Sequence, residues 1–113
     1  MNAEPPTQNV VMPPSVTALL PLLLADAATR SGMPLDRLRV VRASAVTWPD
    51  ASLGCPHPGF SYTQALVSGW LVLIAVPSSA APLQYHGSDR GGWLHCPAER
   101  ASPALPPSSD SRI

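Results

Sequence analysis

The chain has 113 residues, 45% of them hydrophobic, which is enough for one domain with a core but too few for two. Seven Arg residues balance seven acidic residues, no Lys occurs, and the formal net charge is zero. A neutral chain with scattered cations lacks the basic surface that nucleic acids and anionic membranes attract, so neither is an expected partner.

The fifteen Pro residues mark the ends of the domain. Many of them fall before residue 15 or after residue 96, whereas every aromatic residue lies between Trp48 and Trp93. Pro-rich segments without aromatic residues are typical of extended, solvated chain. The sequence therefore predicts disordered tails at residues 1–14 and 98–113 around a single domain at residues 15–97.

The first predicted element is a helix over residues 17–31. Its apolar stripe has helical spacing and consists of Leu20, Leu23, Leu24, Ala27 and Ala28. Ser15 or Thr17 can serve as the N-cap, which places Pro21 near the first turn, and Gly32 suits the residue after the helix.

The apolar run at residues 16–28 also resembles part of a signal peptide or a membrane span. It is interrupted by Pro21 and Asp26, it is short, and no cation precedes it. We therefore assign it to the helix of the domain and expect no membrane span.

The rest of the domain reads as strands. Residues rich in Val, Thr, Tyr and Trp predict strands at residues 38–48, 62–67, 70–76, 83–86 and 93–96. Ser68-Gly69 is expected to form a two-residue turn, and residues 87–92 the turn of a last hairpin. The sum is an α+β fold, in which one N-terminal helix packs on a four- or five-stranded, mainly antiparallel sheet.

The two cysteines are far apart in the chain. Cys55 lies in the segment WPDASLGCPHPGF, whose three Pro residues predict a loop of fixed shape, and Cys96 ends the last strand. A disulfide would tie this loop to the sheet and would indicate an oxidising compartment. The alternative is a pair of free, buried thiols that act as small apolar residues.

A metal site is a second interpretation of the same residues. The ligand types that zinc or copper prefer are present at Cys55, His57, His86, His95 and Cys96. The usual structural-zinc spacings do not occur, and adjacent strand residues such as His95 and Cys96 point to opposite faces.

A small hydrolase is a third interpretation. Asp50, His57 and Ser61 lie close together in the chain, and His86 could take part in acid–base chemistry. No nucleophile-elbow or phosphate-binding motif supports this interpretation, and no cofactor is expected.

The segment from Trp48 to Gln64 carries a family resemblance. Its pattern W-P-D-x-S-L-G-C-P-x-P-G, followed by Y-x-Q, Gly69-Trp70, Tyr85-His86 and Cys96, resembles a family of small uncharacterised bacterial proteins, many of them exported or lipoproteins. The resemblance covers most of residues 22–96 and implies architecture and compartment, but no activity. Two departures are a His at position 57, where the family often has Gln, and PSSAAP in place of a charged hairpin before Tyr85.

The leading hypothesis is a non-enzymatic binding module of the cell envelope or exterior, although no signal peptide is evident. A Pro-fixed, disulfide-tethered loop at residues 48–61 would lose little entropy on binding a protein partner. The alternative role for the loop is to cover the edge of the sheet. The candidate binding residues are Trp48, Asp50, Ser52, Leu53, His57 and Tyr62.

Overall fold

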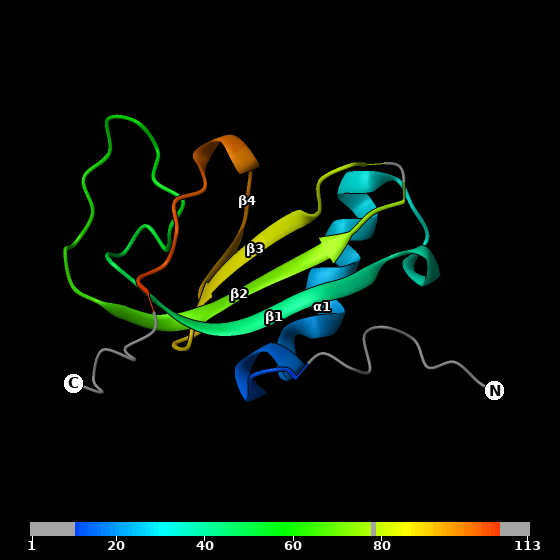
Figure 1. Cartoon of the computed structure of the whole chain (residues 1–113), viewed down its shortest axis with the longest axis horizontal. Helices are drawn as coiled ribbons and strands as arrows, with labels where there is room; N and C mark the ends of the chain where they lie inside the picture. Colours follow the sequence, from blue (N-terminus) through cyan, green and yellow to red (C-terminus); the bar gives the residue numbers. More distant parts are fainter. Residues whose placement is uncertain (1–10, 78, 107–113) are drawn as a thin grey trace.

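The computed structural model describes residues 11–77 and 79–106. One helix packs on a four-stranded antiparallel sheet with strand order β1-β2-β3-β4, which confirms the predicted α+β fold (Figure 1). The elements in chain order are α1 (Pro14–Ser31), η2 (Leu35–Arg37), β1 (Arg39–Trp48), β2 (Val67–Ala75), β3 (Leu83–Ser88), β4 (Trp93–Cys96) and η3 (Ala98–Arg100).

The helix begins three residues before the predicted start. Pro13 is the N-cap and Pro14 is the first helical residue, so the prediction of Ser15 or Thr17 as N-cap is wrong. Proline suits the first position because its missing N–H has no partner there and its φ is already helical. Pro21 consequently lies inside α1 rather than near its first turn. Gly32 ends the helix as predicted, with a φ of 73°.

Within the described residues, no helix is long and apolar enough to cross a membrane.

The predicted strand at residues 62–67 and the turn at Ser68-Gly69 are wrong. Both turn residues lie within β2, where Gly69 pairs with Val46 on one side and Ser88 on the other. A Cβ atom at Gly69 would overlap the carbonyl oxygen of Gly87 on β3. This glycine therefore serves close strand packing rather than chain reversal, and residues 49–66 form one long loop between β1 and β2.

The last hairpin is confirmed. β3 and β4 pair antiparallel, although β3 continues to Ser88, so that the turn is shorter than predicted. The amide of Ser88 donates to the carbonyl oxygen of Gly92 at 2.8 Å, and the amide of Gly91 donates to that of Ser88 at 2.9 Å.

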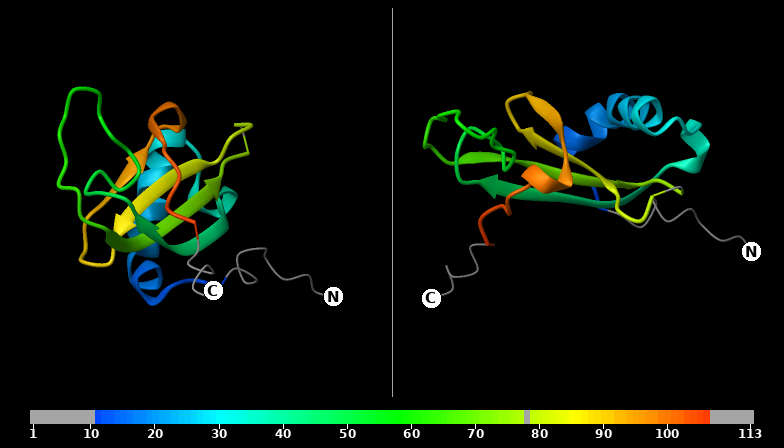
Figure 2. Two further views of the ribbon diagram at one scale, coloured as in Figure 1. Left: turned by 60° about the vertical axis from the view of Figure 1, so that its left-hand side comes forward. Right: turned by 90° about the horizontal axis from the view of Figure 1, so that it is seen from above.

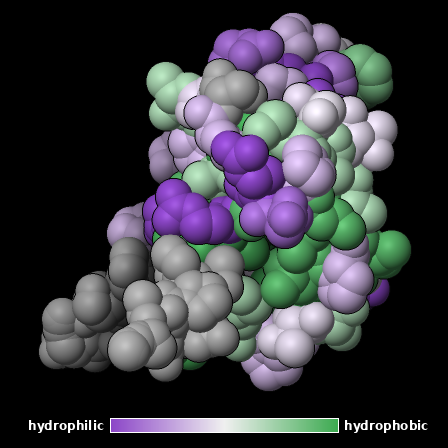
Figure 3. All heavy atoms as spheres, turned by 90° about the vertical axis from the view of Figure 1, so that its right-hand side faces the viewer, coloured by the Kyte–Doolittle hydropathy of each residue, from purple (hydrophilic) through white to green (hydrophobic). Residues whose placement is uncertain are grey.

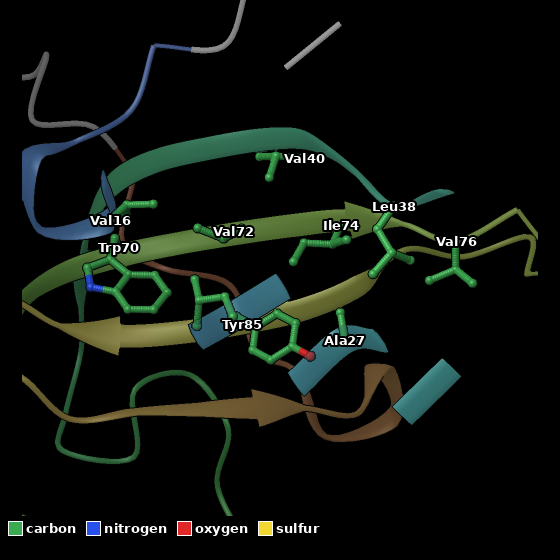
Figure 4. Packing of buried hydrophobic residues seen from close by; sticks show 10 residues of the cluster. Val16, Ala27, Leu38, Val40, Trp70, Val72, Ile74, Val76 and Tyr85 are labelled. Atoms are coloured by element: carbon green, nitrogen blue, oxygen red, sulfur yellow. The ribbon is translucent and has the colours of Figure 1, made fainter. Parts of the chain in front are cut away.

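The main core lies between α1 and one face of the sheet (Figure 4). Its side chains come from the helix, from the segment before β1, from the three longer strands and from the residue that follows β2: Val16, Leu23, Ala27, Leu38, Val40, Trp70, Val72, Ile74, Val76 and Tyr85. The Tyr85 hydroxyl also donates to the carboxylate of Asp26 at 2.6 Å, which joins β3 to α1.

The long loop lies at the end of the sheet opposite η2 (Figures 1 and 2). At the η2 end, apolar surface is interrupted by hydrophilic side chains (Figure 3). Leu35 of η2 is 57% exposed, and such scattered apolar residues are normal on a protein surface.

The predicted C-terminal tail starts with an ordered segment. Residues 98–106 include η3, and the amides of Ser102 and Leu105 donate to the carbonyl oxygens of Gly54 and Thr47 at 2.8 and 2.9 Å. These residues therefore contact the loop and the end of β1. Of the predicted N-terminal tail, residues 11–14 are described and include the N-cap Pro13 and the first helical residue, Pro14. Residues 1–10 and 107–113 lie outside the described part of the chain.

Candidate functional site

The 49–66 loop is fixed at its base by a buried tryptophan. Trp48, the last residue of β1, is 1% exposed, and its indole Nε1 donates to the carbonyl oxygen of Gly87 at 3.0 Å. Its ring stacks on that of His86 at a centroid distance of 4.6 Å. A Cβ atom at Gly54 would overlap the Trp48 ring, so the loop backbone lies directly against the indole. Trp48 thus joins β1, β3 and the loop.

His86 makes the second attachment. It lies on β3 next to Tyr85, and strand alternation directs it to the sheet face away from α1. The ring is 1% exposed, and Nδ1 lies 2.7 Å from the carbonyl oxygen of Leu53. Burial lowers the pKa of His86, so the ring is neutral near pH 7 and Nδ1 carries the proton that it donates to Leu53.

The other ring nitrogen of His86, Nε2, lies 3.1 Å from Oε1 of Gln84. Nε2 of the neutral ring is an acceptor, so the Gln84 amide donates to it when turned by 180° with its NH₂ group toward the ring. The buried imidazole then has a partner at both nitrogens, which is the arrangement of a structural histidine.

A disulfide completes the base of the loop. Cys55 and Cys96 are joined by a disulfide, with their Cα atoms 5.8 Å apart and a sequence separation of 41. The two preceding residues, Leu53 and Gly54, both have positive φ values, 57° and 72°. The predicted link between loop and last strand is therefore present, and a tight left-handed turn leads into it.

Asp50 acts as a turn residue. Its Oδ1 accepts hydrogen bonds from the amide of Ser52 at 2.9 Å and from the Ser52 hydroxyl at 2.6 Å. These hydrogen bonds lower the pKa of Asp50 because they stabilise its ionised form. The carboxylate is thus engaged within the loop rather than directed at a reaction partner.

The far part of the loop carries three rings, which we call the aromatic tip: His57, Phe60 and Tyr62. The ring centroids of His57 and Phe60 are 5.4 Å apart, and those of Phe60 and Tyr62 are 6.5 Å apart. The Tyr62 hydroxyl accepts a hydrogen bond from the His57 amide at 3.0 Å, and the Phe60 amide donates to the His57 carbonyl at 3.2 Å. Local hydrogen bonds therefore close the tip on itself while Phe60 stays 68% exposed.

Arg100 links the tip to the disulfide. One guanidinium nitrogen lies 3.2 Å from Sγ of Cys55 and another lies 3.5 Å from Nδ1 of His57. Arg100 belongs to η3, in the segment that the sequence assigns to a tail. Its contribution could not be predicted because the contacts join residues more than 40 positions apart.

Some of the predicted binding residues belong to the base of the loop, and the others are partly or fully exposed. Trp48, Asp50 and Ser52 are buried or engaged in the base of the loop, Leu53 and Tyr62 are partly exposed, and His57 is exposed. The sequence analysis missed two exposed apolar residues of the loop, Phe60 and Leu66, each 68% exposed. The signal for Phe60 was its place directly after Pro58-Gly59, a turn sequence that favours exposure.

Among the described residues, no three His, Cys, Asp or Glu side chains lie close enough together to hold a metal ion. Both cysteines are in the disulfide and therefore offer no thiolate. The ring centroid of His95 lies 5.5 Å from that of Tyr85, on the face of the sheet that α1 covers, whereas Cys96 bonds to the loop. As predicted, the side chains of His95 and Cys96 point to opposite faces of the sheet.

The hydrolase residues are likewise not brought together by hydrogen bonds among the described residues. Asp50 bonds to Ser52, His57 contacts Arg100, and His86 is enclosed between Trp48 and Leu53. Ser61 is exposed on the loop. A nucleophile–base–carboxylate relay needs these groups in sequence within hydrogen-bond reach, and this arrangement does not supply it.

Comparison with known proteins gives one family. Searches among curated proteins and among solved structures return no match. Residues 20–96 match a family model described as a domain of unknown function, DUF8738. The match spans α1 from Leu20 onward, the whole sheet, the 49–66 loop and both cysteines. The chain therefore belongs to the family DUF8738.

Proposed function

We propose that this protein is a non-enzymatic binding module that presents the aromatic tip of its 49–66 loop to a protein partner. The observation that carries the proposal is the 68% exposure of Phe60 on a loop whose base is buried and covalently fixed. A large aromatic side chain gains most from burial, so its exposure on a constrained loop favours a role in contact with another molecule.

The contrast between the buried base of the loop and its exposed tip supports this proposal. Trp48, Gly54 and Cys55 are buried at the base and account for the attachment to the sheet. Phe60 takes no part in that attachment and faces solvent, and the exposed His57 is linked to the base through Arg100. Covering the edge of the sheet would require the opposite arrangement, with the apolar side chains of the tip turned inward.

A loop that is already fixed in the free protein loses less entropy when it binds a partner. A free loop loses side-chain and backbone entropy when it binds, by about 0.5–1.5 kcal/mol for each immobilised side chain. Here the disulfide and the bond between Tyr62 and the His57 amide restrict the tip before any encounter. Aromatic residues in such settings are enriched among the residues that dominate interface energies.

The compartment proposed for this module is the cell envelope or exterior of a bacterium. Disulfides persist in oxidising environments and are rare in reducing ones, which supports a location outside the cytoplasm. The family resemblance noted at the Trp48 segment points to the same compartment.

The test uses three immobilised proteins: the wild type, Phe60→Ala, and Leu35→Ala as a matched control. Leu35 is 57% exposed but lies on η2, at the opposite end of the molecule. Envelope and secreted fractions of the producing organism are passed over each, and any protein retained is purified and its Kd measured. We expect one partner that binds the wild type and Leu35→Ala equally and Phe60→Ala at least about tenfold more weakly, since a hot spot contributes about 2 kcal/mol.

A partner that binds all three proteins with equal affinity contradicts the proposal. Thermal unfolding of each variant accompanies the binding measurement. Because Phe60 is exposed, Phe60→Ala should unfold at the temperature of the wild type, and lost binding can then be assigned to the surface.

A further inference from the structure

The segment that follows η3 crosses the base of the 49–66 loop and reaches the end of β1 (Figures 1 and 2). We call residues 101–106, with the sequence ASPALP, the proline strap. Ala101 has φ and ψ of −71° and 132°, close to the polyproline II values of about −75° and 145°. Pro103 and Pro106 fix their own φ at about −65° and disfavour helical conformations in the residues before them. The strap is therefore biased toward a polyproline II helix.

The contacts of the strap repeat every three residues, which is the period of that helix. The amides of Ser102 and Leu105 donate to the carbonyl oxygens of Gly54 and Thr47, so one edge of the strap faces the protein. Pro103 and Pro106 are also three residues apart, and both are exposed. They share a second edge, which faces solvent.

This outward edge is not needed to hold the strap in place. Among the described residues, no backbone amide donates to a carbonyl oxygen of residues 101–106. Residues 103–106 border an open hollow over Val46 and Leu71, so the strap does not close that apolar surface of the sheet. Prolines spaced in this way on a polyproline II helix are the feature that aromatic-lined peptide grooves recognise.

We propose that the proline strap is a preorganised ligand for a protein whose groove is lined by aromatic rings. The rings pack against Pro103 and Pro106, and Trp or Tyr donors of the groove bond to the unpaired carbonyl oxygens of the strap. No residue of the strap is charged, so the recognition rests on apolar contact and hydrogen bonds. The strap shares no residue with the aromatic tip, and this proposal therefore stands whether or not the tip binds a partner.

The probes are an SH3 domain and a WW domain, two kinds of domain that bind polyproline II peptides through aromatic-lined grooves. Each is titrated into the ¹⁵N-labelled full chain, and the Kd is obtained from NMR chemical shifts. We expect saturable shifts at Ser102, Ala104 and Leu105 with at least one probe, and none at residues 57–62. Saturable shifts confined to other parts of the chain, or no binding of either probe, would overturn the proposal.

The variant Pro103→Ala tests the outward edge, and Pro77→Ala is its matched control. Pro77 is also exposed, but it lies in the loop after β2. Pro103→Ala should weaken binding of the probe at least about tenfold, whereas Pro77→Ala and Phe60→Ala should leave the Kd unchanged. Both proline substitutions free the unfolded chain in the same way, so the two variants should unfold at similar temperatures. Equal affinity of these two variants for the probe would contradict the proposal.

A synthetic peptide of residues 101–106 with blocked termini tests whether the strap is preorganised. We expect it to bind the same probe more weakly than the full chain does, because the free peptide has to be ordered on binding. Binding of the peptide that equals or exceeds that of the full chain would overturn the proposal, since the strap would then gain nothing from its attachment to the loop and β1.

Discussion

The indole ring of Trp48 and the backbone of Gly54 lie so close that no side chain fits between them. Five residues separate them in the chain, and this intervening segment makes a turn that places Gly54 against the ring. Gly54 has a φ of 72°, so it is required both for the space and for the left-handed conformation. The contact between Gly54 and Trp48 holds the base of the 49–66 loop against the sheet.

Two glycine substitutions separate the need for space beside Trp48 from the need for a left-handed backbone conformation. Gly59 also has a positive φ, 84°, but a Cβ there would meet no atom within 4 Å. We expect Gly59→Ala to lower the free energy of unfolding by about 1 kcal/mol through backbone strain alone. Gly54→Ala should lower it by about 3 kcal/mol, because overlap with Trp48 adds to the strain. Urea unfolding measures both, and equal losses would show that the Trp48 contact contributes nothing.

The pH dependence of stability should report the buried histidine. Burial lowers the pKa of His86 and also that of His95 below their usual value of 6.5. The unfolded chain therefore binds more protons than the folded protein once the pH falls below about 6.5. Stability should be constant from about pH 7.5 to 8 and decrease as the pH is lowered through 6 toward 5.

The variant His86→Gln removes one of the two titrating groups while keeping a side chain that can donate to Leu53. Its free energy of unfolding, measured in urea at pH 5 to 8, should decrease less steeply with acidification than that of the wild type. The remaining slope belongs in part to His95. A His86→Gln profile parallel to the wild-type profile would mean that His86 is not held neutral by burial.

Reduction of the Cys55–Cys96 bond should destabilise the fold. For a sequence separation of 41 between the cysteines, the chain-entropy relation gives a stabilisation of about 4 kcal/mol. Urea unfolding with and without a phosphine reductant should differ by about this amount, and the intact mass under non-reducing conditions should be lower by two hydrogen atoms. The doubly substituted Cys55→Ser, Cys96→Ser protein is the control. It should unfold at the same urea concentration with or without reductant, and a response of that control would place the effect elsewhere.

Much of the fold could be predicted because it rests on local patterns. The apolar stripe of α1 and the apolar run of β2 have the periods of a helix and of a buried strand. The turn predicted at Ser68-Gly69 was wrong because Ser-Gly is a common turn sequence, and only the position of Gly87 on β3 shows why glycine is needed within β2.

The candidate site was harder to predict because its contacts are long-range. The disulfide partner of Cys55 could be proposed because the chain has only one other cysteine. The contacts of Arg100 with Cys55 and His57, and the bond from Ser102 to Gly54, have no local signature. Exposure of Phe60 is likewise set by where the rest of the loop packs, which composition does not reveal.

The proposed binding role depends on a loop that is already rigid in the free protein, and ¹⁵N relaxation at residues 49–66 measures this rigidity. If the buried base and the Cys55–Cys96 bond hold the tip, the backbone order parameters of residues 56–62 in the oxidised protein should be close to the value of about 0.85 expected for the sheet. Order parameters below about 0.6 at the tip, with a rigid sheet beside it, would contradict a loop preorganised for binding.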